Sequence, residues 1–130
     1  MTDKELDFMR NNFRNAVGCY RKKLFKKKEN GIAFTFNRLS MNKIGCIKSI
    51  KKSVQNGFLI EEHLEAAENI KDLFEHSTVV EETYKDKETK FETHYLCICK
   101  IHNDVYAWMN VVTWRNNEGY INLYLSREAE

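Results

Sequence analysis

Hydrophobic residues recur every three or four positions in the first part of the chain. This spacing runs from Asp3 to Lys28 and predicts an amphipathic helix, which ends before the turn residues Asn30 and Gly31. Acidic residues in its first turn and lysines in its last turns complement the helix dipole. Residues 32–36 are β-branched and aromatic, which predicts a short strand or an extended connector.

Helical spacing returns in the next segment. Ser40 is placed to cap a second helix, whose apolar residues run from Ile44 to Val54 before a stop at Asn56 and Gly57. A third helix follows from Ile60 to Phe74, with glutamates at its outward positions. We therefore expect three helices before His76.

The remaining sequence alternates between apolar and polar residues, as half-buried strands do. Four segments rich in Val, Ile, Tyr, Trp and Thr carry this pattern: residues 78–84, 91–101, 105–114 and 120–127. Asn103 and Asp104 fit a two-residue hairpin turn, and residues 116–119 fit a longer turn with Gly119 at its positive-φ position.

These elements predict one α+β domain over residues 1–130. Its helices are expected to pack on one face of a four-stranded antiparallel meander, or of a five-stranded one if residues 32–36 join its edge. The three parts are a basic amphipathic helix (1–30), a short strand with two helices (31–76) and the meander (77–127).

The hairpin turn determines which side chains share a face of the predicted sheet. With Asn103 and Asp104 in the turn, Ile101 lies opposite Tyr106, and each strand alternates between the two faces. One face is aliphatic and is expected to lie under the helices: Leu96, Ile98, Val105, Ala107, Met109, Val111, Ile121, Leu123 and Leu125. The other face is aromatic and polar: Tyr95, Cys97, Cys99, Tyr106, Trp108, Asn110, Trp114, Tyr120, Asn122, Tyr124 and Ser126.

The aromatic face is the first candidate binding site. Its binding residues are expected to be Tyr95, Tyr106, Trp108, Asn110, Trp114 and Tyr124. Rings that combine apolar area with a hydrogen-bonding edge can stack on unpaired bases or anchor a protein partner. The first helix, or the second copy in a homodimer, can equally cover this face, and the sequence leaves these arrangements open.

Charge is distributed unevenly along the chain, although the formal net charge is only +2. Residues 1–60 contain 14 Lys and Arg against 4 Asp and Glu, whereas residues 61–130 contain 7 against 15. The densest basic cluster is a second candidate site, for a polyanion: Arg21, Lys22, Lys23, Lys26 and Lys27. The alternative is that this cluster pairs with the acidic half of the same chain.

Several classes of protein are not indicated by the composition. No run approaches the roughly 18 apolar residues of a membrane helix. The N-terminus lacks the basic and apolar regions of a signal peptide, so we expect a cytoplasmic protein with no membrane partner. The four cysteines, Cys19, Cys46, Cys97 and Cys99, lack the spacing of a disulfide framework or a zinc site, and we predict no metal and no cofactor.

Short motifs between residues 36 and 127 resemble a domain family of mobile genetic elements. The motifs are Arg38-Leu39-Ser40, His63 with residues 66–75, His94-Tyr95, residues 103–106 and residues 117–120. In this order they resemble the third of the large polyvalent protein-associated domains, which occur in phage and conjugative-element proteins. The resemblance implies a mobile-element origin and a layout like that of the barnase, EndoU, colicin and RelE group of ribonucleases.

Ribonucleases of that group cleave RNA without a metal, using a general base, a general acid and a cation that holds the phosphate. The matching candidates are His94 as acid or base, Glu92 as the carboxylate and Arg115 as the cation. In the expected register, His94 and Glu92 share the parity of the aliphatic face, and a hairpin loop longer by one residue would reverse this parity.

We therefore favour a binding protein over an enzyme. It is expected to dock on a nucleic acid or nucleoprotein of the host, as an inhibitor or in an anti-defence role. A metal-independent endoribonuclease is the alternative.

Overall fold

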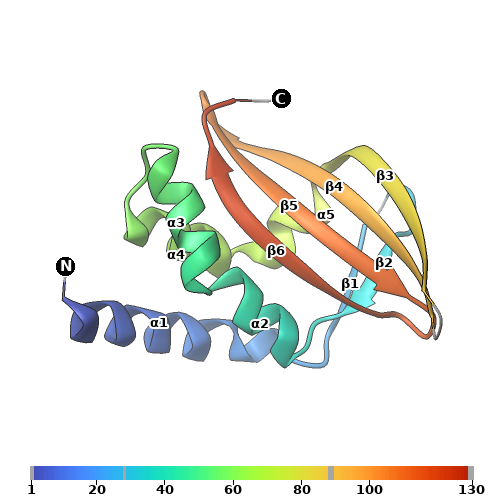
Figure 1. Cartoon of the computed structure of the whole chain (residues 1–130), viewed down its shortest axis with the longest axis horizontal. Helices are drawn as coiled ribbons and strands as arrows, with labels where there is room; N and C mark the ends of the chain where they lie inside the picture. Colours follow the sequence, from blue (N-terminus) through green and yellow to red (C-terminus); the bar gives the residue numbers. More distant parts are fainter. Residues whose placement is uncertain (1, 28, 88–89, 129–130) are drawn as a thin grey trace.

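The chain forms helices first and a long curved sheet afterwards, as Figure 1 shows for the computed structural model, which describes residues 2–27, 29–87 and 90–128. The helices are α1 (Asp3–Val17), the 3-10 helix η1 (Gly18–Tyr20), α2 (Arg38–Ile44), α3 (Ile47–Gln55), α4 (Ile60–Glu68) and α5 (Ile70–Glu75). The strands are β1 (Leu24–Lys26), β2 (Ala33–Thr35), β3 (Thr78–Lys87), β4 (Lys90–His102), β5 (Val105–Trp114) and β6 (Glu118–Ser126).

The sheet has the topology that the sequence predicts. Strands β3, β4, β5 and β6 follow one another as an antiparallel meander, so the α+β class is confirmed. The segment at residues 32–36 does contain a strand, but this strand is not a fifth member of the meander. Strand β2 pairs instead with β1 in a separate two-stranded sheet, with Phe34 opposite Phe25.

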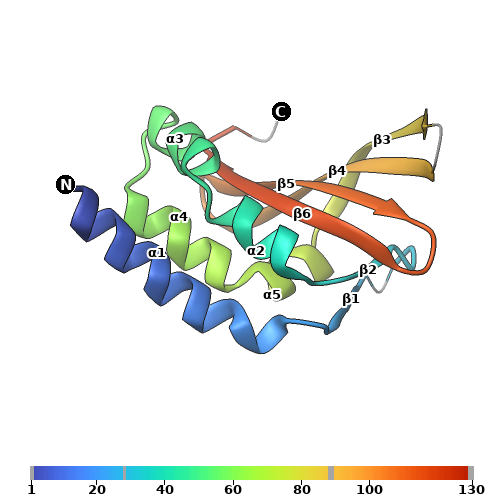
Figure 2. The same ribbon diagram turned by 60° about the horizontal axis from the view of Figure 1, so that its bottom comes forward.

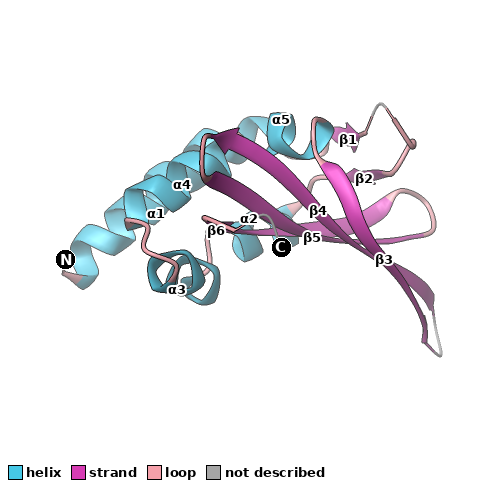
Figure 3. Ribbon diagram, turned by 90° about the horizontal axis from the view of Figure 1, so that it is seen from above, coloured by secondary structure: helices cyan, strands magenta, loops and turns pink. Residues whose placement is uncertain are grey.

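The helices form two groups around the sheet. Helices α4 and α5 contact its strands β6 and β4, and α1 packs on α4 as an outer layer (Figure 2). Helices α2 and α3 run along the edge strand β6. Seen from above, α1, α4 and α5 lie on one side of the sheet and α3 lies beside β6 (Figure 3).

The first helix ends about ten residues earlier than its hydrophobic spacing predicts. It stops at Val17, and the chain then turns through η1 and Lys22, which has a φ of 68°, into strand β1. Phe25 lies in this strand and is fully buried, with its ring stacked on Phe36 at 4.8 Å and near Phe74 at 6.4 Å between ring centroids. Burial of this ring outweighs the helical preference of the lysines around it.

The second and third predicted helices are each divided in two. The first division falls at Gly45, between α2 and α3, where a Cβ atom would lie 2.5 Å from Cε2 of Phe13 in α1. The second falls at Asn69, between α4 and α5. Ser40 is not the cap of α2, because Asn37 caps this helix and accepts a hydrogen bond from the Ser40 backbone N–H.

Serine hydroxyls of α2 and α3 accept hydrogen bonds from backbone N–H groups along the outer edge of β6. The backbone N–H of Ile121 donates to Ser40 Oγ at 3.2 Å, and that of Leu125 donates to Ser53 Oγ at 2.9 Å. Asn56 Nδ2 donates to the Leu125 carbonyl at 2.8 Å. These contacts occupy backbone groups through which an edge strand could pair with another chain.

The faces of β5 and β6 agree with the sequence prediction. The residues expected under the helices are buried there: Val105, Ala107, Met109, Val111, Ile121, Leu123 and Leu125. They belong to one cluster of buried side chains between the sheet and the helices.

Strand β4 has the opposite parity to the one predicted. The turn at Asn103 and Asp104 is correct, and His102 pairs with Val105, but the register shifts at Ile101, so that Cys97 pairs with Met109. A β-bulge of this kind adds one residue to one strand and exchanges the two faces beyond it. Tyr95, Cys97 and Cys99 therefore face the helices. Glu92, His94, Leu96 and Ile98 were expected on the aliphatic face under the helices, and they lie instead on the opposite face.

The turn between β5 and β6 also differs from its prediction. Asn116 and Asn117 adopt the positive φ angles, 67° and 57°, that were assigned to Gly119. Gly119 is needed for space instead, because a Cβ atom there would lie 2.3 Å from the Val112 carbonyl oxygen. Asparagine adopts the left-handed region more readily than other residues with side chains, which explains the exchange of roles.

Buried His63 predicts a pH-dependent stability. Its Nδ1 lies 2.7 Å from Ser53 Oγ and its Nε2 lies 2.8 Å from the Ile44 carbonyl oxygen, an arrangement that suits the neutral ring with the proton on Nε2. Burial lowers the pKa of His63 below its ordinary value of 6.5.

Below the ordinary pKa of 6.5, His63 of the unfolded chain binds a proton that the folded chain excludes. The stabilisation that neutral His63 gives the fold is therefore complete above that pH and is lost as the pH falls. We expect the free energy of unfolding to drop by up to about 1.4 kcal/mol per pH unit through this group. Denaturant titrations of the protein and of His63→Gln should differ by an amount that shrinks in acid. Parallel curves from pH 8 to 5 would contradict the expectation.

Candidate functional site

The face of the meander turned away from α4 and α5 carries the candidate site, and we call it the open face. Its side chains come from all four strands of the meander: Thr78, Glu81 and Thr83 of β3, Glu92, His94, Leu96, Ile98 and Lys100 of β4, Tyr106, Trp108, Asn110, Val112 and Trp114 of β5, and Tyr120, Asn122, Tyr124 and Ser126 of β6. Of the predicted binding residues on the sheet, only Tyr95 lies on the other face. The first helix does not cover the open face, because α1 packs on α4.

Trp108, one of the predicted binding residues, is not exposed. Its exposure is 7%, its ring stacks on Tyr124 with 6.4 Å between centroids, and its Nε1 donates to the Glu128 carbonyl at 2.9 Å. The rings that remain half-exposed are Tyr106, Trp114, Tyr120 and Tyr124. Trp108 therefore supports the neighbouring ring rather than offering its own.

Two lysines of the α2–α3 segment lie over tyrosines of the open face. Lys52 Nζ is 3.9 Å from the centroid of the Tyr124 ring, and Lys43 Nζ is 4.7 Å from that of Tyr120. Both distances are within the range of cation–π attraction. Neither lysine is among the residues predicted from the sequence, although residues 31–60 contain five Lys and Arg and no Asp or Glu, which is a visible signal.

A cleft of about 320 Å³ separates α3 from the open face. Helical residues form one wall: Lys43, Cys46, Lys48, Ser49 and Lys52. Strand residues form the other: Asn110, Asn122, Leu123 and Tyr124. The Ser49 hydroxyl donates to Asn122 Oδ1 across the cleft, so the two walls are joined at its base. The cleft is thus basic, lined by amides and closed on one side by an aromatic ring.

The start of α3 adds to the positive potential of this cleft. Cys46 caps the helix, and the Ser49 backbone N–H lies 3.5 Å from its Sγ. Burial raises the pKa of the Cys46 thiol, but hydrogen bonds from Ser49 and the Lys48 backbone and the charge of Lys43 outweigh burial and lower it overall. The cleft therefore favours negative charge.

Glu92 and His94 meet on the open face, contrary to the predicted parity. His94 Nε2 lies 3.0 Å from Glu92 Oε2, and the carboxylate is almost completely buried. His94 lines a hollow of about 190 Å³ with Glu81, Thr83, Tyr95, Leu96, Asn110 and Val111, so the described lining includes a carboxylate and no lysine or arginine. Arg115 lies exposed in the turn between β5 and β6.

The basic cluster at residues 21–27 lies on the helix side of the molecule, where β1 contacts α5. Arg21, Lys22, Lys23 and Lys26 are exposed, as a binding role would need. Lys27 is buried with 1% exposure, and its Nζ donates to the carbonyl and hydroxyl of Ser77 and, at 3.4 Å, to the Phe74 carbonyl. Its inclusion among the binding residues is wrong, since it holds the C-terminal end of α5.

Replacing this buried lysine should destabilise the fold. We expect Lys27→Ala to cost about 1–3 kcal/mol, because it leaves buried carbonyls with fewer donors. Lys26→Ala is the matched control, since Lys26 is exposed and should change stability by no more than about 0.5 kcal/mol. Urea unfolding of both variants tests the difference, and equal stabilities would show that Lys27 is not structural.

Within the described residues, no three His, Cys, Asp or Glu side chains are grouped as a metal site would require. No helix found in those residues has the length and apolar character needed to span a membrane. The chain matches no protein-family model, and comparisons with curated proteins and with solved structures give no significant match.

Proposed function

We propose that this protein binds single-stranded nucleic acid across the open face, with the phosphates held by the lysines of the α2–α3 segment. The observation that carries this proposal is the position of Lys43 and Lys52 over the rings of Tyr120 and Tyr124, beside a basic cleft. Aromatic platforms next to a positively charged groove are the usual elements of single-strand binding.

The chemistry of this surface favours unpaired bases. Lysines lie over the rings of Tyr120 and Tyr124, and the half-exposed rings of Tyr106 and Trp114 extend the aromatic surface on which bases can stack. In a duplex the base faces are already stacked on one another. The amides of Asn110 and Asn122 can hydrogen-bond to base edges or to the sugar. The lysines have no acidic neighbours in residues 31–60, so a phosphate can approach them without displacing a carboxylate from this segment.

The resemblance of residues 36–127 to a mobile-element domain supports the biological part of the proposal. The protein then originates in a phage or mobile element and docks on a nucleic acid or nucleoprotein of the host, with an inhibitory or anti-defence effect. This part rests on the sequence motifs alone.

Fluorescence anisotropy with labelled oligouridine and oligothymidine tests the binding function. We expect affinity for single strands to exceed that for a duplex of equal length. The logarithm of the binding constant should fall with the logarithm of the salt concentration with a slope of about −2, the value for about three phosphate contacts. Absence of binding at low salt, or a salt-independent affinity, would overturn the proposal.

A second function, metal-independent RNA cleavage, is favoured by one observation: the 3.0 Å contact between His94 and Glu92 on the open face. A buried carboxylate can orient a histidine for general acid or base catalysis. This function predicts RNA cleavage in the presence of a chelator and a loss of about 100-fold to 10,000-fold in rate for His94→Ala. The proposed binding function predicts intact RNA under the same conditions and retained binding by that variant.

A further inference from the structure

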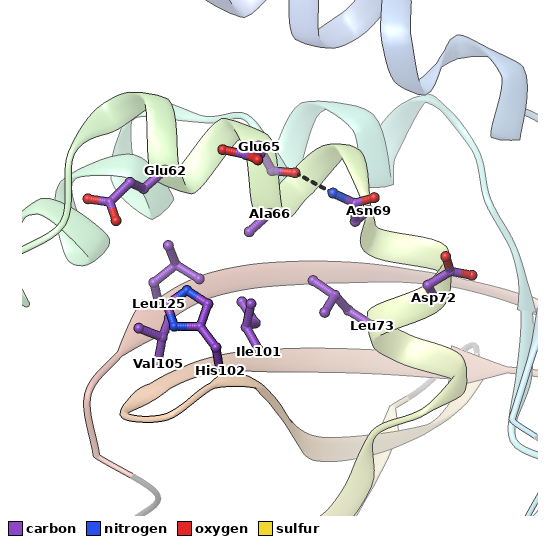
Figure 4. Close-up of a pocket in the computed structure, with 10 residues that line it drawn as sticks. All are labelled: Glu62, Glu65, Ala66, Asn69, Asp72, Leu73, Ile101, His102, Val105 and Leu125. Carbon is purple, nitrogen blue, oxygen red and sulfur yellow. Dashed lines mark hydrogen bonds between the residues drawn. The ribbon is translucent and has the colours of Figure 1, made fainter.

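An apolar pocket with an acidic rim lies on the helix side of the sheet, between α4, α5 and the β4–β5 hairpin (Figure 4). Its volume is about 400 Å³, which is in the range of ligand-binding clefts. Ile101, Val105 and Leu125 lie on the sheet side, and Glu62 and Glu65 lie on the helix above them (Figure 4). The open face is on the other side of the sheet, so an occupant of this pocket leaves it free.

The β-bulge contributes to the pocket. Ile101 is the extra residue between the paired positions Lys100 and His102, and its side chain lines the pocket while remaining 37% exposed. An exposed isoleucine beside Leu73 offers apolar area that a partner's side chain can bury.

The charge around the pocket selects a basic partner. Three carboxylates line it, from Glu62, Glu65 and Asp72. Residues 60–75, which form the two helices above it, contain six Asp and Glu against one lysine. An occupant with an apolar side chain and adjacent lysines complements both the apolar area and the rim.

The same chain presents such a segment in β1. Leu24 is 47% exposed, although it belongs to a strand that buries the adjacent Phe25. The exposed residues beside it are Arg21, Lys22, Lys23 and Lys26, and Lys26 shares its outward side of the strand. This segment carries an apolar side chain within a basic surface, the opposite charge to that of the pocket.

We propose that copies of this chain associate head to tail, with Leu24 of one copy in the acidic-rimmed pocket of a second copy and the lysines around Leu24 (Lys22, Lys23 and Lys26) facing its carboxylates. We call Leu24 with the basic residues around it the knob. Because knob and pocket are different surfaces, the contact is heterologous. A pair of copies therefore leaves one knob and one pocket unoccupied, and further copies can add to them or a ring can close. The association is expected to weaken with salt, because its charged rim is exposed to solvent.

Sedimentation of the full chain without nucleic acid, at low salt and rising protein concentration, tests the proposal independently of the binding function. Leu24→Asp removes the knob, and the double variant Glu62→Lys/Glu65→Lys reverses the charge of the pocket at two exposed helical positions. Each variant alone should associate at least about tenfold more weakly than the unmodified chain. An equimolar mixture of the two should form a dimer, because it restores one intact knob and one intact pocket.

Leu39→Asp is the matched control, since Leu39 is similarly exposed but lies in α2. It should associate as the unmodified chain does, and far-ultraviolet circular dichroism establishes that all variants are folded. A chain that stays monomeric at every concentration would overturn the proposal. So would association that survives both the knob and the pocket variants, since contact through another surface, such as the open face, would then be responsible.

Discussion

Lys43→Glu combined with Lys52→Glu is expected to weaken binding of single-stranded nucleic acid by about 100-fold or more at low salt. Each lysine lies over a tyrosine beside the cleft, where its ammonium group can contact a phosphate while the ring contacts a base. Charge-assisted hydrogen bonds are worth about 1.5–3 kcal/mol each, and two of them account for this loss. Anisotropy with labelled oligouridine measures it, and the slope of the salt dependence should flatten by about 1 to 2.

Reversal of Lys22 and Lys23 is the matched control, because it changes the net charge by the same amount on the helix side of the molecule. Its effect on affinity should be small when the protein is dilute enough to be monomeric. A larger loss from this control would move the binding site to the basic cluster of residues 21–27, which was the second candidate on sequence grounds.

Met109→Ala should cost about 2–5 kcal/mol of stability, whereas Leu96→Ala should cost no more than about 1 kcal/mol. Met109 is fully buried among the helices and pairs with Cys97, while the bulge at Ile101 places Leu96 on the open face, where it is half-exposed. In the register without a bulge, both residues lie under the helices and both substitutions are severe.

Denaturant unfolding of the two variants therefore tests the register of β4 in solution. Val54→Ala, at a position exposed on α3, controls for the loss of an exposed aliphatic side chain and should be close to neutral. Equal and large losses for Met109→Ala and Leu96→Ala would contradict the bulge, and with it the placement of Glu92 and His94 on the open face.

The meander was predictable because its signals are local. Alternation with a period of two, β-branched residues and turn residues such as Asn103 and Asp104 all act over a few positions. These signals give the order of the four strands and the buried faces of β5 and β6. Their turn, by contrast, uses Asn116 and Asn117 where glycine was expected, since either residue type can adopt a positive φ.

The bulge in β4 and the position where the first helix ends were not predictable, because tertiary packing determines both. One extra residue at Ile101 leaves the turn unchanged and yet reverses every side chain of β4 beyond it. Phe25 fits a helical stripe as well as a buried strand, and only the other rings of the core, Phe36 and Phe74, select the strand. Lys27 belongs to a run of lysines, which predicts an exposed side chain. It is buried because its ammonium group donates to carbonyl groups near the end of α5, and these are about 50 positions away in the sequence.

The aromatic part of the candidate site was predictable from the sequence, and its basic part was not. Aromatic residues of β5 and β6 share a face through the simple alternation of a strand. The lysines that lie over them come from α2 and α3, and the edge contacts of Ser40 and Ser53 that bring these helices to β6 join residues more than 70 positions apart. Periodicity describes neighbours along a segment and contains no information about such distant pairs.

A backbone-amide NMR titration with unlabelled oligouridine tests the central claim most directly, because it reports the location of the ligand residue by residue. We expect the largest shifts at Asn110, Asn122 and Tyr124 and along the first turns of α3, around Lys48, with little change at the acidic-rimmed pocket. Shifts confined to residues 22–26, in β1 and directly before it, would contradict the assignment of the open face as the nucleic-acid interface. So would the absence of shifts at low salt.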